Sequence, residues 1–306
     1  MSISPKESQA LQSHIIPDPL PGTGKISPEF EMQAALIPDQ YRFEYQSPAK
    51  LISTIQTTID SGSAEEYFLY FYNINHGHLP EIDEEFWTCQ LRCTVRFTTE
   101  NSLSALICKV LCRGNFSTLG LNLWFKIENR IEKTIPGRTH DSIEPLYGNR
   151  FYVSDVRSKE GYQAIAPVTR GEWAAWPSVV MEVGSSEALE FLRLDAKWWL
   201  INSAGNTRFV MLVQLLTEPF AIHIECWAIV ASDDRQTIQG VTQTPACVQL
   251  FDIDAEGTVA SESLDLRIPY SSIFDELKEN APDAEFTNAE LSSFALRMFR
   301  LFSRYF

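Results

Sequence analysis

Hydrophobic residues along this chain recur at two spacings, and their alternation predicts an α/β protein. Between residues 47 and 62, apolar positions three and four apart predict a helix that ends at Gly62. A similar stripe at residues 103–111 predicts that residues 84–119 are mostly helical, with Thr99 as a cap. The aromatic stretch 65–72 fits either a short strand or a buried helical turn.

The middle of the chain carries the clearest pattern. Residues 178–183 form an apolar, β-branched run, which predicts a buried strand. Ser185 or Ser186 then predicts the cap of an amphipathic helix. Two more apolar runs, 208–216 and 222–230, predict two strands. A strand, a helix and two strands in this order predict a parallel crossover pair with an antiparallel neighbour.

The remaining segments complete a sheet flanked by helices. Shorter apolar runs predict further strands at residues 121–127, 151–156, 246–252 and 264–268. Thr287 and Glu290 have the spacing of a capping box at the start of a last helix. Residues 1–40 are rich in Pro, Ser and Gln, which disfavours regular structure. We therefore expect a flexible tail over residues 1–45 and a single domain over residues 46–306.

The charge of the chain disfavours nucleic acid as a partner. The sequence has 40 acidic and 25 basic residues, and its formal net charge is −15. Such a surface repels phosphate backbones at long range, so DNA or RNA binding would need a local basic cluster. No export signal and no apolar run long enough to cross a membrane are visible. We expect an intracellular protein, cytoplasmic or nuclear, that has no membrane partner; the sequence indicates no oligomeric state.

Six cysteines in a chain without an export signal are expected to stay reduced. Two pairs are four residues apart, Cys89 with Cys93 and Cys108 with Cys112. On helices, this spacing places both thiols of a pair on one face. Zinc sites more often space their cysteines within a turn, so we expect buried small residues, with a metal site as the alternative.

From residue 177 the chain reads PSVVMEVGSSEALEFLRLDAKWWL. This block resembles that of a family of uncharacterised fungal proteins related to the PD-(D/E)XK nuclease superfamily. The positions that carry the resemblance are Pro177, Glu182, Val183, Gly184, Ser186, Leu192, Arg193, Asp195, Ala196, Trp198, Trp199 and Leu200. Residues 96–120 look like the first core helix of the family, and residues 266–299 look like its C-terminal segment. The resemblance covers about residues 85–302.

The resemblance implies a restriction-endonuclease-like core, in which a central mixed sheet is flanked by helices. Active members of that superfamily hold Mg²⁺ with acidic residues from two adjacent strands, and a lysine polarises the attacking water. Glu182 matches one of these acids and is the candidate metal ligand. Glu100 matches a glutamate that assists from the first core helix, although an acid in a first helical turn also fits the helix dipole.

The sequence departs from the active pattern at two positions. Gly161 and Tyr162 stand where the Pro-Asp pair belongs, and the neutral phenol of Tyr162 is a poor Mg²⁺ ligand. Gly184 stands where the lysine belongs. Arg193 or Lys197, on the following helix, would then supply the basic group. Asp155 would supply the second metal ligand if the strand register differs.

Two roles remain open for Glu182 at the sequence level. It is a metal ligand or the vestige of one, or it is the ion-pair partner of Arg193. The missing acid and lysine favour a catalytically inactive nuclease-like domain that serves as a binding or scaffold module without a cofactor. The alternative is an active Mg²⁺-dependent nuclease that cleaves DNA or RNA phosphodiesters with Glu182 as metal ligand. A third interpretation is that the protein has no catalytic activity at present.

Overall fold

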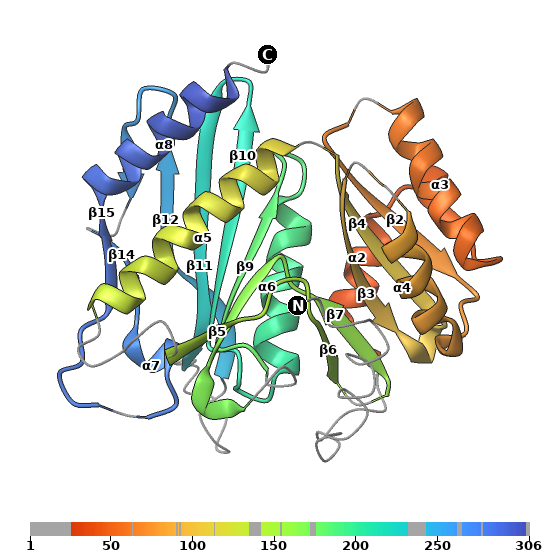
Figure 1. The fold of residues 1–306 in the computed structure, drawn as a ribbon, viewed down its shortest axis with the longest axis horizontal. Helices are drawn as coiled ribbons and strands as arrows, with labels where there is room; N and C mark the ends of the chain where they lie inside the picture. The colour runs from red at the N-terminus through yellow and green to blue at the C-terminus, as the bar shows by residue number, and fades with distance from the viewer. Residues whose placement is uncertain are drawn as a thin grey trace, which may run out of the picture. The chain divides into compact units, whose positions relative to one another are not determined.

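The computed structural model describes residues 26–303, apart from residues 63, 90, 92, 113, 135–141, 154, 172–175, 232–242, 262–264 and 277. The chain divides into two compact units (Figure 1). Unit 1 comprises Met1–Gly114 and Gly148–Glu160, and unit 2 comprises Asn115–Tyr147 and Gly161–Phe306. This division differs from the single domain expected over residues 46–306.

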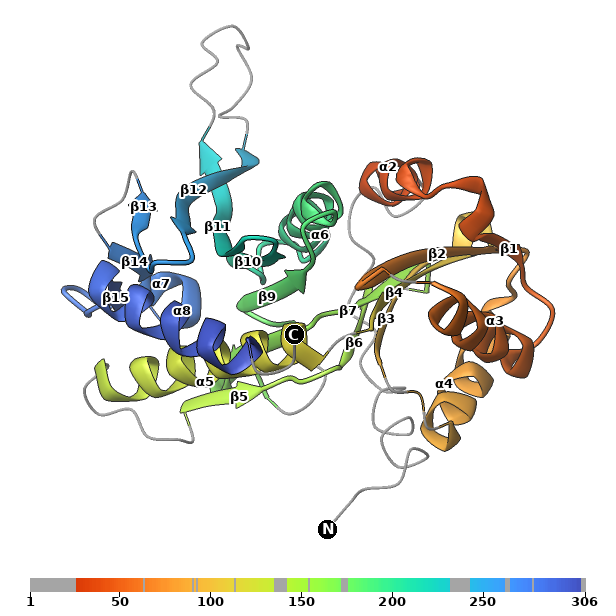
Figure 2. The same ribbon diagram turned by 90° about the horizontal axis from the view of Figure 1, so that it is seen from above.

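Unit 1 is built on a six-stranded sheet in the order β1-β2-β4-β3-β7-β6. Its strands are β1 (Arg42–Glu44), β2 (Glu66–Tyr72), β3 (Thr94–Glu100), β4 (Ala105–Leu111), β6 (Arg150–Val153) and β7 (Arg157–Glu160). Strand β1 is parallel to β2, and the other neighbours are antiparallel. Helices α3 (Pro48–Ser61) and α4 (Leu79–Thr88) cover one face, and α2 (Pro28–Leu36) lies on the other (Figure 2).

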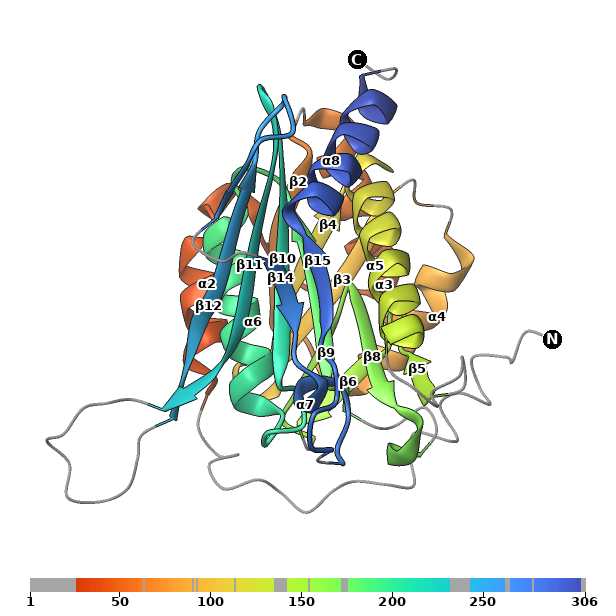
Figure 3. The ribbon, with the colours of Figure 1, turned by 90° about the vertical axis from the view of Figure 1, so that its left-hand side faces the viewer.

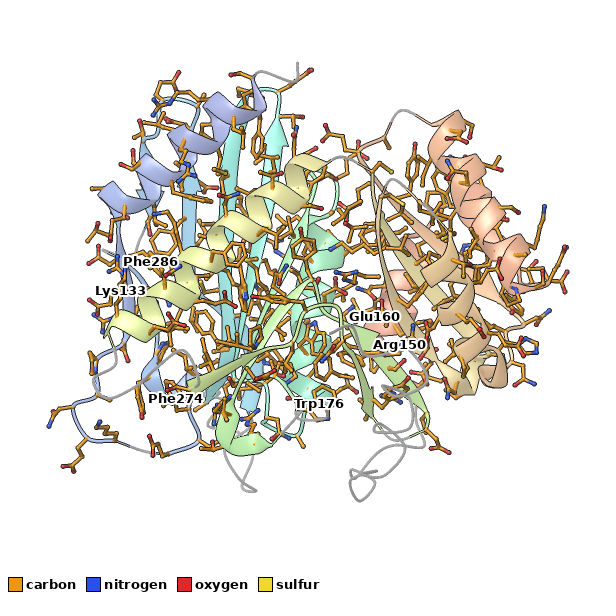
Figure 4. All side chains as sticks on the ribbon, viewed as in Figure 1. Lys133, Arg150, Glu160, Trp176, Phe274 and Phe286 are labelled. Carbon is orange, nitrogen blue, oxygen red and sulfur yellow. The ribbon has the colours of Figure 1, made fainter. Side chains whose placement is uncertain are left out.

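The core of unit 1 forms where α3 meets the sheet. Leu51 and Ile55 of α3 pack against Leu69 and Phe71 of β2, and α3 ends before Gly62 as expected. At the start of β6, the guanidinium of Arg150 donates to both carboxylate oxygens of Asp83, at 2.8 and 2.9 Å. It also donates to Glu160 at 2.7 Å, and Figure 4 shows these two side chains next to each other. These contacts join the end of the sheet to α4.

Two sequence expectations for unit 1 are wrong. The helix expected over residues 84–119 is largely replaced by the antiparallel strands β3 and β4. All seven residues of β4 are buried. Its apolar residues therefore include positions three and four apart, and this spacing also fits one face of a helix. The tail expected over residues 1–45 includes helix α2, because proline is tolerated in a first helical turn and Ser27 caps it.

Unit 2 is built on a seven-stranded sheet in the order β13-β12-β11-β10-β9-β8-β5. Its strands are β5 (Ile143–Pro145), β8 (Gln163–Pro167), β9 (Val179–Gly184), β10 (Phe209–Thr217), β11 (Phe220–Ala231), β12 (Gln243–Ile253) and β13 (Val259–Ser261). Strands β9 and β10 are parallel, and the other neighbours are antiparallel. A separate pair is formed by β14 (Asp265–Ile268) and β15 (Ala284–Thr287), with the short helix α7 (Tyr270–Ile273) between them.

Helices cover both faces of this sheet. Helix α6 (Leu189–Asn202) lies on one face, and α5 (Gly114–Thr134) and α8 (Asn288–Phe302) lie on the other (Figure 3). The crossover from β9 through α6 to the parallel β10, followed by the antiparallel β11, confirms the pattern expected for the middle of the chain. The protein is therefore α/β, with mixed sheets flanked by helices.

Local helix signals in unit 2 were partly misleading. Thr287 and Glu290 form the expected capping box at the start of α8. Helix α6, in contrast, follows Ala188 without a side-chain cap, so the expected serine cap is wrong. The strand expected at residues 121–127 lies inside α5, where exposed Leu121 and Phe125 repeat at helical spacing.

Candidate functional site

Glu182 lies in the middle of unit 2, on the buried strand β9. Its strand pairs with β10 in parallel, so that Glu182 faces Leu212 in the register. The residue is only 1% exposed. Its Oε1 accepts a hydrogen bond from the indole Nε1–H of Trp199 on α6, at 2.9 Å. A carboxylate this far from water needs such a donor, because burial without a partner would cost several kcal/mol.

Tryptophan rings pack beside this carboxylate. The ring of Trp176 stacks on Trp198 at a centroid distance of 6.1 Å and meets Trp199 edge-on at 6.0 Å. Trp198 and Trp199 are almost fully buried, as expected for core aromatic residues. A Cβ atom at Gly161 would lie 3.2 Å from the Trp199 ring. The surroundings of Glu182 are therefore tightly packed and largely apolar.

The phenol of Tyr162 lies on the opposite face of the sheet from the Glu182 carboxylate. Tyr162 immediately precedes β8, whose Gln163 is opposite Met181 of β9. Its ring meets α5, whereas the Glu182 carboxylate meets Trp199 of α6, and these two helices cover opposite faces of the sheet. Tyr162 is 3% exposed, and its ring packs so closely on α5 that a Cβ atom at Gly120 would lie 2.5 Å from it. A core aromatic residue thus occupies the position at which the resemblance implies a second acid.

Of the two candidate cations on α6, Arg193 binds a different carboxylate and Lys197 lies near a tryptophan ring. Arg193 donates from Nη2 to Glu225 Oε1 at 2.6 Å and from Nε to both Glu225 oxygens at 3.1 and 3.2 Å. It also reaches the exposed Glu190 at 3.1 Å. The Nζ of Lys197 lies 5.9 Å from the centroid of the Trp227 ring, within reach of a cation–π interaction. The alternative in which Glu182 pairs with Arg193 is therefore wrong: Arg193 binds Glu225 and Glu190, and Trp199 donates to Glu182.

Glu225, on β11, is the centre of the densest polar network of unit 2 among the described residues. The Nε1–H of Trp227 donates to its Oε2 at 2.8 Å, and His223 Nε2 lies 3.1 Å from its Oε1. Burial opposes ionisation of Glu225, but the hydrogen bonds from His223, Arg193 and Trp227 outweigh it and lower its pKa to about 2. The carboxylate is ionised over the whole physiological range.

His223 extends this network to the next strand. Its Nδ1 lies 2.6 Å from Asp252 Oδ1 on β12, opposite His223 in the register. The hydrogen bond to Glu225 raises the pKa of His223, burial opposes this rise, and Asp252 adds to it. The imidazole between two carboxylates is thus held toward its charged form. No motif in the sequence marks Glu225 as functional, although the alternation HIECW already places His223, Glu225 and Trp227 on one face of a strand.

The other two candidate residues belong to unit 1. Glu100 is fully buried at the end of β3, where it accepts from the backbone N–H of Ser27 at 3.2 Å and from Ser102 Oγ at 2.6 Å. Arg157 Nε lies 3.3 Å from the same carboxylate. The alternative of a first-turn helix acid is wrong, because Glu100 ends a strand. Asp155 is exposed in the turn between β6 and β7, and its carbonyl accepts a hydrogen bond from the Asn101 side chain.

The residues around Glu182 do not fit a Mg²⁺ ion. Mg²⁺ requires near-octahedral coordination by oxygen ligands, several of which are usually water. One oxygen of Glu182 instead binds an indole N–H, and tryptophan rings pack beside it. Within the described ranges, no group of three or more His, Cys, Asp and Glu side chains is arranged to hold a metal ion.

No helix in the described part of the chain is long and apolar enough to cross a membrane. Comparisons of the chain with family models, with curated proteins and with solved structures find no match.

Proposed function

We propose that this protein contains a PD-(D/E)XK nuclease-like domain that no longer hydrolyses phosphodiesters and serves as a binding or scaffold module. The proposed relation to the nuclease superfamily rests on the resemblance of residues 177–200. The sheet of unit 2 is compatible with it, because the block begins at a buried strand and continues through a crossover helix to a parallel strand. Its fold alone does not establish a function.

The burial of Glu182 and its hydrogen bond to Trp199 are the main support for this proposal. Its side chain is 1% exposed, and Trp199 donates to one of its oxygens at 2.9 Å. A hydrolytic metal site needs open positions for water and for the substrate phosphate. The packed rings of Trp176 and Trp199 leave the carboxylate a structural role, as an acceptor that holds α6 on the sheet.

Two further features support a loss of nuclease activity. The cations of α6 are held near Glu225 and Trp227, so neither stands where a water-polarising group is needed. The formal net charge of −15 also opposes the approach of a nucleic acid. The alternative is an active Mg²⁺-dependent nuclease in which Glu182 is a metal ligand.

A cleavage assay separates these two functions. The full chain, Glu182→Gln and the control Glu190→Gln are incubated with plasmid, single-stranded DNA and RNA, with Mg²⁺, with Mn²⁺ and with neither. We expect the same background with all three proteins and no dependence on the metal. Metal-dependent cleavage that is lost in Glu182→Gln and kept in Glu190→Gln would overturn the proposal in favour of the active nuclease.

The net charge of −15 disfavours nucleic acid as the partner of the binding module, and a second experiment tests this expectation. Fluorescence anisotropy of labelled duplex and single-stranded oligonucleotides is followed at low ionic strength, where electrostatic binding is strongest. We expect no saturable binding. Tight binding that weakens steeply with salt would show that the partner is a nucleic acid and that the net charge is misleading.

A further inference from the structure

We infer that Cys93 and Cys112 of unit 1 form a reversible disulfide site that reacts with a small-molecule disulfide such as oxidised glutathione. This inference is independent of the proposed function. It rests on the strand register of unit 1, which brings together cysteines that are far apart in the sequence. The pairs selected by spacing alone, Cys89 with Cys93 and Cys108 with Cys112, are not the pair that the register selects.

The antiparallel pairing of β3 and β4 places the two thiols opposite each other. Thr94 at the start of β3 faces Leu111 at the end of β4. One step further along the same register, Cys93 faces Cys112. On the other side of β4, the backbone N–H of Cys112 donates to the Glu65 carbonyl at 2.9 Å, which continues the pairing of β4 with β2 to Cys112.

This placement is compatible with the dimensions of a disulfide. Directly opposite residues of an antiparallel pair have Cα atoms about 4.5–5.5 Å apart. Disulfides span Cα separations of about 4.4–6.8 Å. Neither cysteine is part of a disulfide in this structure, and both are partly exposed and packed against the same hydrophobic cluster.

A third thiol lies close to this pair. Burial and the neighbouring thiols of Cys112 and Cys89 raise the pKa of Cys93 to about 12. Cys93 is therefore a poor first nucleophile, because the thiolate is the attacking species. Cys108, on β4, is fully buried and is therefore inaccessible to a small-molecule disulfide.

The reaction proceeds in two balanced exchange steps. The Cys112 sulfur attacks one sulfur of oxidised glutathione, its S–S bond breaks, and one glutathione leaves with the proton of Cys112. The Cys93 sulfur then attacks the mixed disulfide at Cys112, and the second glutathione leaves with the proton of Cys93. Two cysteine thiols are oxidised and one glutathione disulfide is reduced to two thiols. Excess reduced glutathione reverses both steps.

The product links two segments of unit 1. Cys93 lies in the connection between α4 and β3, and Cys112 immediately follows β4. The disulfide would fasten this connection to the end of β4. The thiol form is the resting state in a reducing compartment, and the disulfide forms when the ratio of oxidised to reduced glutathione rises.

Peptide mapping by mass spectrometry tests this site. The full native chain is treated with oxidised glutathione, free thiols are alkylated, and the protein is digested without reduction. We expect a peptide pair joined through Cys93 and Cys112 that disappears after treatment with reduced glutathione. Cys112→Ser abolishes this pair, whereas Cys247→Ser, which removes an exposed thiol of unit 2, leaves its yield unchanged.

Three outcomes would overturn the inference. The first is modification of Cys247 by glutathione with no link between Cys93 and Cys112. The second is a dominant link between Cys89 and Cys93, which would contradict the register argument. The third is stoichiometric zinc in the native mass spectrum that protects these thiols from alkylation, which would assign the cluster to a metal. Circular dichroism of Cys112→Ser checks that the variant is folded.

Discussion

The Glu225 network makes a quantitative prediction about the stability of unit 2. The substitution Glu225→Gln keeps the shape of the side chain and removes the charge that Arg193 and His223 surround. The guanidinium and the imidazole then lose their anionic partner at a position that is 1% exposed. We expect a large loss of folding free energy, because breaking a buried ion pair leaves a poorly compensated charge.

The pKa of Glu225 sets the magnitude. It is about 2 in the folded protein, against an ordinary value of 4.5. This difference corresponds to about 3 kcal/mol of stabilisation near neutral pH. Because the folded pKa is depressed, the stabilisation is present above pH 4.5 and is lost as the pH falls toward about 2.

His223 acts in the opposite direction. Its folded pKa is raised above 6.5, so its contribution is complete below pH 6.5 and is lost as the pH rises through the folded value. The network of Glu225 and His223 therefore stabilises the fold most between pH 4.5 and 6.5.

Urea denaturation followed by circular dichroism measures this effect. Near pH 6 we expect Glu225→Gln to be about 3 kcal/mol less stable than the wild type, and near pH 4 the gap narrows by about 1 kcal/mol. The control Glu190→Gln removes the other carboxylate on Arg193, which is 70% exposed, and costs less than about 1 kcal/mol. Equal losses in the two variants, or a gap that does not change with pH, would refute the reasoning.

Three other substitutions test separate features by thermal or urea denaturation. Arg150→Met leaves two carboxylates of unit 1 without their cation and costs about 3–5 kcal/mol; a cost below about 1 kcal/mol would contradict the buried pairing. Gly120→Ala improves helix propensity yet places a Cβ atom 2.5 Å from the Tyr162 ring, so we expect a destabilisation of about 1–3 kcal/mol, and a gain in stability would show that the ring moves freely. Thr287→Ala removes the capping box of α8 and costs about 1 kcal/mol, whereas an unchanged midpoint would mean that the cap is dispensable.

Parts of the fold follow from local sequence signals. The apolar run of β9, the amphipathic helix α6 and the strands β10 and β11 were predicted because each has its own periodicity or composition. The capping box of α8 was predicted because its hydrogen bonds join residues three positions apart. In these segments, the interactions that select the structure lie within a few residues.

Other parts depended on contacts between distant segments. Strand β4 is buried at every position, so its sequence does not distinguish a central strand from a helix until its neighbours β2 and β3 are known. The partners of the candidate residues are also distant in the chain. Trp199 reaches Glu182 from 17 positions away, and Arg193 reaches Glu225 from 32 positions away.

The sequence by itself determined the α/β class, the crossover unit around α6 and the choice of Glu182 as a buried strand carboxylate. The tertiary structure alone decided that Trp199 donates to this carboxylate, that Arg193 of α6 binds Glu225, and that Thr94 and Leu111, the neighbours of Cys93 and Cys112, face each other. The physical reason is that a periodic pattern shows which face of an element is buried. Only the strand register and the packing of helices on the sheet determine which side chains meet on that face.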